Sequence, residues 1–178
     1  GADAQHSGRL HREGLNAGGT RPTTPATVGC YSPFAVREYI PQIKAAAPDA
    51  PLVVHFHNDL GLGAWNTVMA LGSGAEVFTT SVNGIGERTG NAPMHQVLLQ
   101  LRYLFGIEIP HFKYDKLRDL ARHLALISGI PVQPTEAGIG LNVFTHASGI
   151  HTPGMRIHPA IYPFTLPPAR DAGLESTY

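Results

Sequence analysis

The chain has 178 residues, and its 13 Lys and Arg balance its 13 Asp and Glu, so the formal net charge is zero with histidine neutral. This balance gives no electrostatic reason to expect a nucleic acid or an anionic membrane as partner. Apolar residues make up 43% of the chain, enough for a packed core, and the single cysteine, Cys30, excludes an internal disulfide framework. No apolar run reaches the roughly 20 residues of a membrane helix and no secretory signal is visible, so we expect a cytoplasmic protein.

In chain order, residues 1–23 show no apolar period and contain glycine and proline breakers, so they are interpreted as a loose leader of unassigned structure. From residue 24 to residue 105 the pattern alternates. Short β-prone runs are each followed by a helical apolar stripe, with strands predicted at 27–31, 52–57 and 77–82 and helices at 33–43, 65–71 and 93–105. Such alternation predicts parallel βαβ units of the α/β class.

The remainder of the chain, residues 106–178, shows a different sequence pattern. An amphipathic helix is predicted over 117–127, and Gly129 and Pro131 end it. Residues 132–178 are rich in glycine, proline and histidine and have little regular period. We therefore expect a second, mostly helical segment over 106–178.

Two histidines stand two residues apart at the end of the second predicted strand. Because strand side chains alternate between faces, His55 and His57 point the same way while Phe56 points oppositely. Two imidazoles on one face can share a metal ion, but a bare His-x-His pair also occurs as core or surface histidines without metal. The carboxyl ends of parallel strands are where α/β enzymes place their active sites, which favours the metal interpretation.

A glycine-rich loop, residues 83–91, follows the third predicted strand and so lies on the same rim. Asn91 could offer its amide oxygen to a divalent ion. Glu87 and Arg88 could pair and shape the loop. The alternative is an ordinary turn whose glycines merely permit positive φ angles.

Four ordered motifs resemble the isopropylmalate, homocitrate and citramalate synthase family. They are HFHNDLGL at 55–62, NGIGERTGNA at 83–92, TVG at 27–29 and FTHASGIH at 144–151. The resemblance implies the metal-dependent, Claisen-condensing branch of the TIM barrels. It implies that 24–105 form the last three strand–helix units of a partial (β/α)8 TIM barrel and that 106–178 form a small linker subdomain.

The same resemblance implies an acyltransferase that condenses acetyl-CoA with a 2-oxo acid, as in amino-acid biosynthesis, for example leucine biosynthesis. His55, His57 and Asn91 would bind a divalent metal ion, either Mg, Mn or Zn. Thr27 would contact the 2-oxo acid. His151 would transfer a proton and Tyr162 would help to position it. In this family the linker commonly serves a partner subunit's barrel, so a homodimer is implied.

The family's first strand carries a metal-binding Asp and a neighbouring Arg, and no such strand exists in this sequence. We therefore expect a fragment cut at both ends that binds metal weakly and is inactive alone. Two alternatives stay open. One is a carbon–carbon lyase of the same superfamily, of hydroxymethylglutaryl-CoA lyase or aldolase type, although such relatives generally lack the Ser-Gly-Ile-His segment. The other is a non-enzymatic truncated remnant.

Overall fold

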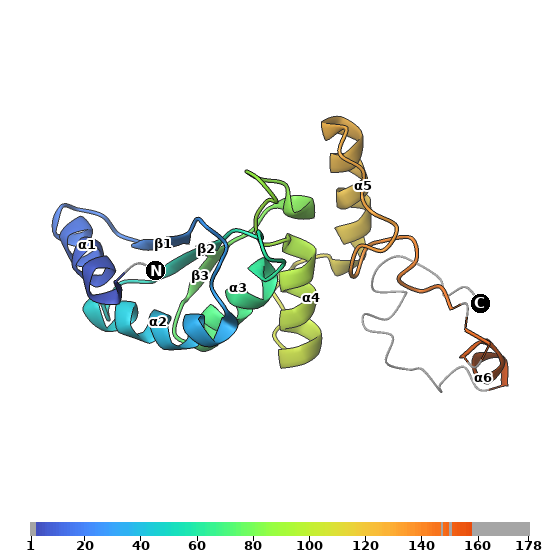
Figure 1. Ribbon diagram of the computed structural model, residues 1–178, viewed down its shortest axis with the longest axis horizontal. Coiled ribbons are helices and arrows are strands. Elements are labelled where there is room, and N and C mark those ends of the chain that lie inside the picture. Colours follow the sequence, from blue (N-terminus) through green and yellow to red (C-terminus); the bar gives the residue numbers. More distant parts are fainter. Residues whose placement is uncertain (1–2, 147, 150, 158–178) are drawn as a thin grey trace. The chain divides into compact units, whose positions relative to one another are not determined.

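The computed structural model describes residues 3–146, 148–149 and 151–157 (Figure 1). Its internal contacts divide the chain into two units, Gly1–Val97 and Leu98–Tyr178, and each is described by itself. The division falls inside one helix, whereas the sequence predicted boundaries after residues 23 and 105; those domain boundaries stay predictions. Over the described residues, no helix has the length and apolar character needed to cross a membrane.

The first unit is built on a parallel sheet of three strands, in the order β1-β2-β3. The strands are β1 (Thr23–Ala26), β2 (Val53–Phe56) and β3 (Val77–Thr79). The register places Pro25 beside His55 and His55 beside Thr79. All three strands run in the same direction, so their carboxyl ends meet at one edge, as the βαβ pattern predicted.

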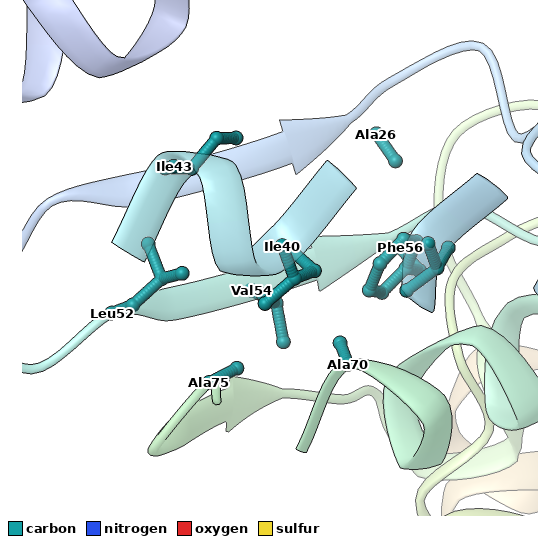
Figure 2. Close-up of a cluster of buried hydrophobic side chains, with 9 residues drawn as sticks. Ala26, Ile40, Ile43, Leu52, Val54, Phe56, Ala70 and Ala75 are labelled. Carbon is teal, nitrogen blue, oxygen red and sulfur yellow. The ribbon is translucent and has the colours of Figure 1, made fainter. Parts of the chain in front are cut away.

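Helices α1 (Ala4–Asn16), α2 (Pro33–Ala46) and α3 (Gly63–Gly72) accompany the sheet in this unit. Ile40 and Ile43 of α2 belong to one cluster with Val54 and Phe56 of β2 (Figure 2), and all four residues are buried. Phe56 and Val54 therefore face the helices, which leaves the intervening residue of the strand, His55, for the opposite face. The apolar core lies between the sheet and α2 and α3.

Local signals place α2 where the sequence predicted it. The Ser32 hydroxyl accepts a hydrogen bond from the Ala35 backbone N–H at 3.2 Å, and Pro33 occupies the first helical position. Val36, Ile40 and Ile43 supply the buried stripe at helical spacing. Pro41 lies inside the helix, which continues through it to Ala46.

The first predicted strand is wrong in position. Residues 27–31 form no strand, and β1 lies upstream at Thr23–Ala26 despite containing Pro25. Gly29 turns the chain with a φ of 66°, and its N–H bonds back to the Ala26 carbonyl at 3.1 Å. Proline is tolerated in β1 because this strand is at the edge of the described sheet and does not need every backbone donor.

The interpretation of residues 1–23 as a loose leader is also wrong where the structure describes them. Ala4–Asn16 is helical, and Asp3 caps it by accepting from the Gln5 N–H at 3.0 Å. Its contact with α2 depends on a small residue, since a Cβ added at Gly8 would lie 2.7 Å from the Ala46 Cβ. A helix that packs through glycine has no large apolar stripe, which is why the periodicity missed it.

Helix α4 (Met94–Phe105) follows a short 3-10 turn, η1 (Val82–Gly84), and confirms the helix predicted from Pro93. In the second unit come η2 (Tyr114–Lys116), α5 (Leu117–Ser128) and α6 (His151–Ile157). Helix α5 matches its prediction closely and ends at Gly129 in the left-handed conformation. Helix α6 lies in the region where the sequence showed little regular period.

Candidate functional site

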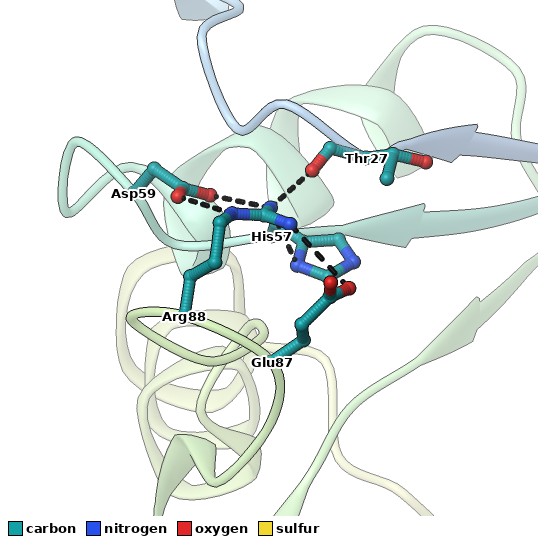
Figure 3. Close-up of polar contacts among 5 residues, drawn as sticks. All are labelled: Thr27, His57, Asp59, Glu87 and Arg88. Atoms are coloured by element: carbon teal, nitrogen blue, oxygen red, sulfur yellow. Dashed lines mark hydrogen bonds and ion pairs between the residues drawn. The ribbon is translucent and has the colours of Figure 1, made fainter.

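The candidate site is formed by the loops that leave the carboxyl ends of β1, β2 and β3. The loop after β1 contributes Thr27, the loop after β2 contributes His57 and Asp59, and the loop after β3 contributes the glycine-rich segment 83–91. All of these residues belong to the first unit. Figure 3 shows the side chains of His57, Asp59 and Glu87 and the backbone carbonyl of Thr27 gathered around the Arg88 guanidinium.

The histidine pair has the geometry that the strand alternation predicted. The rings of His55 and His57 lie edge to face with their centroids 5.1 Å apart. His55 Nδ1 lies 2.6 Å from the hydroxyl of Thr79, its register partner on β3. Burial, followed by the neighbouring His57, lowers the pKa of His55, which favours the neutral form of its ring. A neutral imidazole is the form that binds a metal ion.

A backbone clamp holds Asn91 opposite His57. The Asn58 N–H donates to the Gly90 carbonyl and the Ala92 N–H donates to the Phe56 carbonyl, both at 2.9 Å. These bonds flank an antiparallel bridge between His57 and Asn91. In this arrangement the two residues form a non-hydrogen-bonded pair, in which side chains stand on one face at about 4.5–5.5 Å between Cβ atoms.

The Asn91 side chain is half-buried and lies against the glycine-rich loop. A Cβ atom at Gly86 would lie 2.5 Å from the Asn91 amide nitrogen, so the loop leaves just enough room for this amide. Its oxygen, Oδ1, is buried and has no hydrogen-bond partner. A buried amide oxygen without a partner is costly, which suggests that it has a ligand to bind.

Arg88 joins all three loops (Figure 3). Its guanidinium donates to Asp59 through Nε at 2.7 Å and through Nη2 at 3.0 Å. Nη2 also donates to the Thr27 carbonyl and lies 3.1 Å from His57 Nδ1. Glu87 is 3.4 Å from Nη1, which confirms the predicted pairing of Glu87 with Arg88. The hydrogen bonds from Arg88 hold the pKa of the Asp59 carboxyl below its usual range.

The predicted site residues are distributed over both units. His55, His57 and Asn91 are brought together, and Thr27 lies nearby through its carbonyl contact with Arg88. His151 begins α6 in the second unit, with its ring centroid 6.3 Å from that of His146. Tyr162 lies outside the described residues.

Sequence reasoning missed two contacts. Thr79 was not singled out, although the parallel register would have placed it beside His55. Arg88 was expected to shape its own loop, but its bonds to Thr27 and His57 cross from one loop to two others. Asn58, in the same motif as the histidine pair, accepts a hydrogen bond from the Gly63 N–H at 2.9 Å, at the start of α3.

The donor set fits a divalent metal ion in chemistry and in placement. Two imidazoles and one amide oxygen without a partner lie together at the strand ends. The set contains no carboxylate, and the described residues hold no cluster of three His, Cys, Asp or Glu side chains suited to a metal. One contact opposes metal binding, namely the one between Arg88 and His57.

A family model described as HMGL-like matches residues 2–124, which is more than half of the chain. The chain belongs to the HMGL-like family. The chain is similar to the homocitrate synthase AksA of Methanopyrus kandleri, with 38% identity over 86% of this chain. It is also similar to 2-isopropylmalate synthase 2 of Caldanaerobacter subterraneus, with 36% identity over 89% of this chain. The aligned regions are 38% and 40% of those proteins, so this HMGL-like chain spans well under half of their length.

Solved structures agree on the fold of this HMGL-like chain. The hydroxymethylglutaryl-CoA lyase of Pseudomonas aeruginosa is 25% identical, with a TM-score of 0.63 over 72% of this chain and 44% of the lyase. The HMG-CoA lyase of Bacillus subtilis has a TM-score of 0.66 over 74% of this chain and 46% of the lyase. These neighbours are TIM barrels, so the predicted fold class, a partial TIM barrel of the α/β class, is confirmed.

Proposed function

We propose that the chain is part of an acyltransferase that condenses acetyl-CoA with a 2-oxo acid with the help of a divalent metal ion. The observation that carries the proposal is the similarity, at 36–38% identity, to proteins named homocitrate synthase and 2-isopropylmalate synthase. The grouping of His55, His57 and Asn91 at the strand ends supports it independently. A cytoplasmic role in amino-acid biosynthesis, such as leucine biosynthesis, belongs to the same proposal.

In the proposed reaction, His55, His57 and Asn91 hold the metal ion, which can be Mg²⁺, Mn²⁺ or Zn²⁺. When bound, the ion would polarise the keto group of the 2-oxo acid. The lowered pKa of His55 supports this role, because it favours the neutral imidazole, the form that binds a metal ion. Thr27, at the end of β1, is proposed to contact the 2-oxo acid.

The proton steps need a group with a pKa near the working pH. A base removes a proton from the methyl group of acetyl-CoA, the methyl carbon attacks the keto carbon, and hydrolysis of the thioester releases CoA. We assign proton transfer to His151 and its positioning to Tyr162, since histidine is the side chain that most often serves as general acid or base. We further propose that these two residues serve the barrel of a second copy of the chain, in a homodimer.

The similarity to hydroxymethylglutaryl-CoA lyases favours a second candidate, a lyase that cleaves a carbon–carbon bond. The segment Ser148 to His151 argues for the synthase, because it belongs to one of the four motifs by which the sequence resembles the synthase family.

The test joins this chain to the N-terminal barrel segment of a homocitrate synthase relative and measures CoA release with a thiol reagent. Pyruvate, 3-methyl-2-oxobutanoate and 2-oxoglutarate are each offered with acetyl-CoA and Mn²⁺. We expect CoA release with one of them, its loss in His57→Ala, and no loss in His123→Ala, which changes an exposed histidine on α5. Release with none of them, together with cleavage of hydroxymethylglutaryl-CoA, would favour the lyase.

A further inference from the structure

Arg88 and His57 contact each other in a way that decides where the imidazole carries its proton. A guanidinium group can only donate hydrogen bonds. The 3.1 Å contact from Arg88 Nη2 therefore requires a lone pair on His57 Nδ1. A neutral ring with a lone pair on Nδ1 carries its hydrogen on Nε2. In this state neither nitrogen of His57 can bind a metal ion, since one is occupied and the other is protonated.

His55 is in the opposite condition. Its Nδ1 lies 2.6 Å from the Thr79 hydroxyl, which can accept a hydrogen bond. With the hydrogen on Nδ1, the Nε2 lone pair of His55 is available to a metal ion, and an oxygen acceptor on the second nitrogen is the usual partner of a metal-binding histidine. The two ring centroids are 5.1 Å apart, but only His55 has a nitrogen lone pair available to a metal ion.

The contact to His57 is also the one that Arg88 can give up most easily. Nη2 has two hydrogens but three acceptors, namely the Thr27 carbonyl, Asp59 Oδ2 and His57 Nδ1. If Nη2 leaves His57, both hydrogens keep a partner, and Nε keeps its bond to Asp59 Oδ1 at 2.7 Å. The side chain can therefore release the ring without losing its anchor.

The geometry points to Arg88 as an internal cation that occupies His57 in the absence of metal and that a divalent ion must displace. This inference rests on the proposed metal-binding role of His57. Once displaced, the guanidinium stays beside the site on Asp59, where its positive charge repels the ion. Arg88 therefore lowers metal affinity in two ways. It holds His57 in the tautomer with hydrogen on Nε2, and its positive charge repels the metal ion.

The test is a Zn²⁺ titration of the 178-residue chain followed by calorimetry and by long-range ¹H–¹⁵N NMR of the histidine rings. The metal-free chain should show His57, identified by its loss in His57→Ala, with hydrogen on Nε2. Zn²⁺ should move that hydrogen to Nδ1. Arg88→Met removes the donors and the charge at similar length, and we expect it to bind Zn²⁺ at least about tenfold more tightly.

Arg37→Met is the matched control, because Arg37 is an exposed arginine on α2 that pairs only with its neighbour Glu38 in the described ion pairs. It should leave Zn²⁺ affinity unchanged. Equal or weaker Zn²⁺ binding by Arg88→Met would overturn the inference while leaving the metal site, and the proposed function, in place. Absence of Zn²⁺ binding in every protein would instead overturn the metal site itself. The tautomer of the metal-free wild type tests the contact without any variant: hydrogen on Nδ1 of His57 would refute it.

Discussion

Helices α2 and α5 show how differently the two units use an amphipathic pattern. In α2 the apolar residues are covered, with Val36 and Ile40 each 1% exposed. In α5 the pattern is equally clear in sequence, but Leu126 is 81% and Ile127 68% exposed. The first unit offers α2 a sheet to pack against, whereas the described part of the second unit covers only one side of α5, around Leu117 and Ala121. An amphipathic sequence thus determines that a helix forms, but not whether other elements bury its apolar face.

The groove beside α5 and the histidine pair also belong to different units. A groove of about 580 Å³ runs beside α5 and is lined by residues that include Arg122, Leu126 and Leu141. The histidine pair lies in the other unit, at the strand ends. The groove is therefore lined by none of the proposed metal ligands.

The largest difference between the units should appear when a large apolar side chain is truncated in each, one buried and one exposed. Phe56→Ala empties part of the core between β2 and α2 and should lower the free energy of unfolding by about 3–5 kcal/mol. Leu126→Ala, on the exposed side of α5, should change it by less than about 0.5 kcal/mol. Urea denaturation followed by circular dichroism measures both, and an equal loss in the two variants would break the comparison.

A smaller contrast concerns two glycines with positive φ. Gly90 (φ 91°) precedes Asn91, and an added Cβ would overlap the Gly84 backbone carbonyl. Gly138 (φ 79°) in the second unit would meet only the flexible end of the Leu99 side chain. Gly90→Ala should cost about 1–3 kcal/mol through strain.

The two alanine variants also differ in their expected effect on the site. Gly90→Ala should shift the amide signals of Asn91 and His57, because Gly90 carries one bond of the backbone clamp. Gly138→Ala should cost less and leave those signals in place. A ¹H–¹⁵N spectrum of each variant measures the shifts, and unchanged Asn91 signals in Gly90→Ala would argue against a rigid clamp.

The smallest expected effect depends on pH. Glu76 accepts hydrogen bonds from Lys44 Nζ at 2.8 Å and from the Leu52 N–H at 2.9 Å, and these lower the pKa of its carboxyl. A folded-state pKa below the unfolded value stabilises the fold above the unfolded pKa, and this contribution is lost as pH falls through the folded pKa.

Glu76→Gln should therefore be less stable than the wild type at pH 7, and the difference should shrink to nothing in acid. Urea denaturation at several pH values measures it. Glu108→Gln in the second unit removes a simpler surface pair with Arg102, 2.9 Å apart, and should change stability less at pH 7. A Glu76→Gln difference that stays constant with pH would contradict the assignment.

Local signals in the sequence determined much of the first unit. The Ser32–Pro33 start of α2, the stripe through Ile40 and the alternation that turns His55 and His57 to one face all depend on residues close in the chain. Nearest-neighbour sterics and side-chain period govern such features, so they can be read without knowing the fold.

Tertiary structure alone decided the rest. Helix α1 depends on Gly8 fitting against Ala46, nearly forty residues away, and it contains few apolar residues that could mark it in the sequence. Asn91 reaches His57 only because backbone bonds bring the glycine-rich loop across the end of β2. Arg88 meets His57 for the same reason. These contacts join segments far apart in sequence, and their energy comes from packing and hydrogen bonds that exist only once the strands are in register.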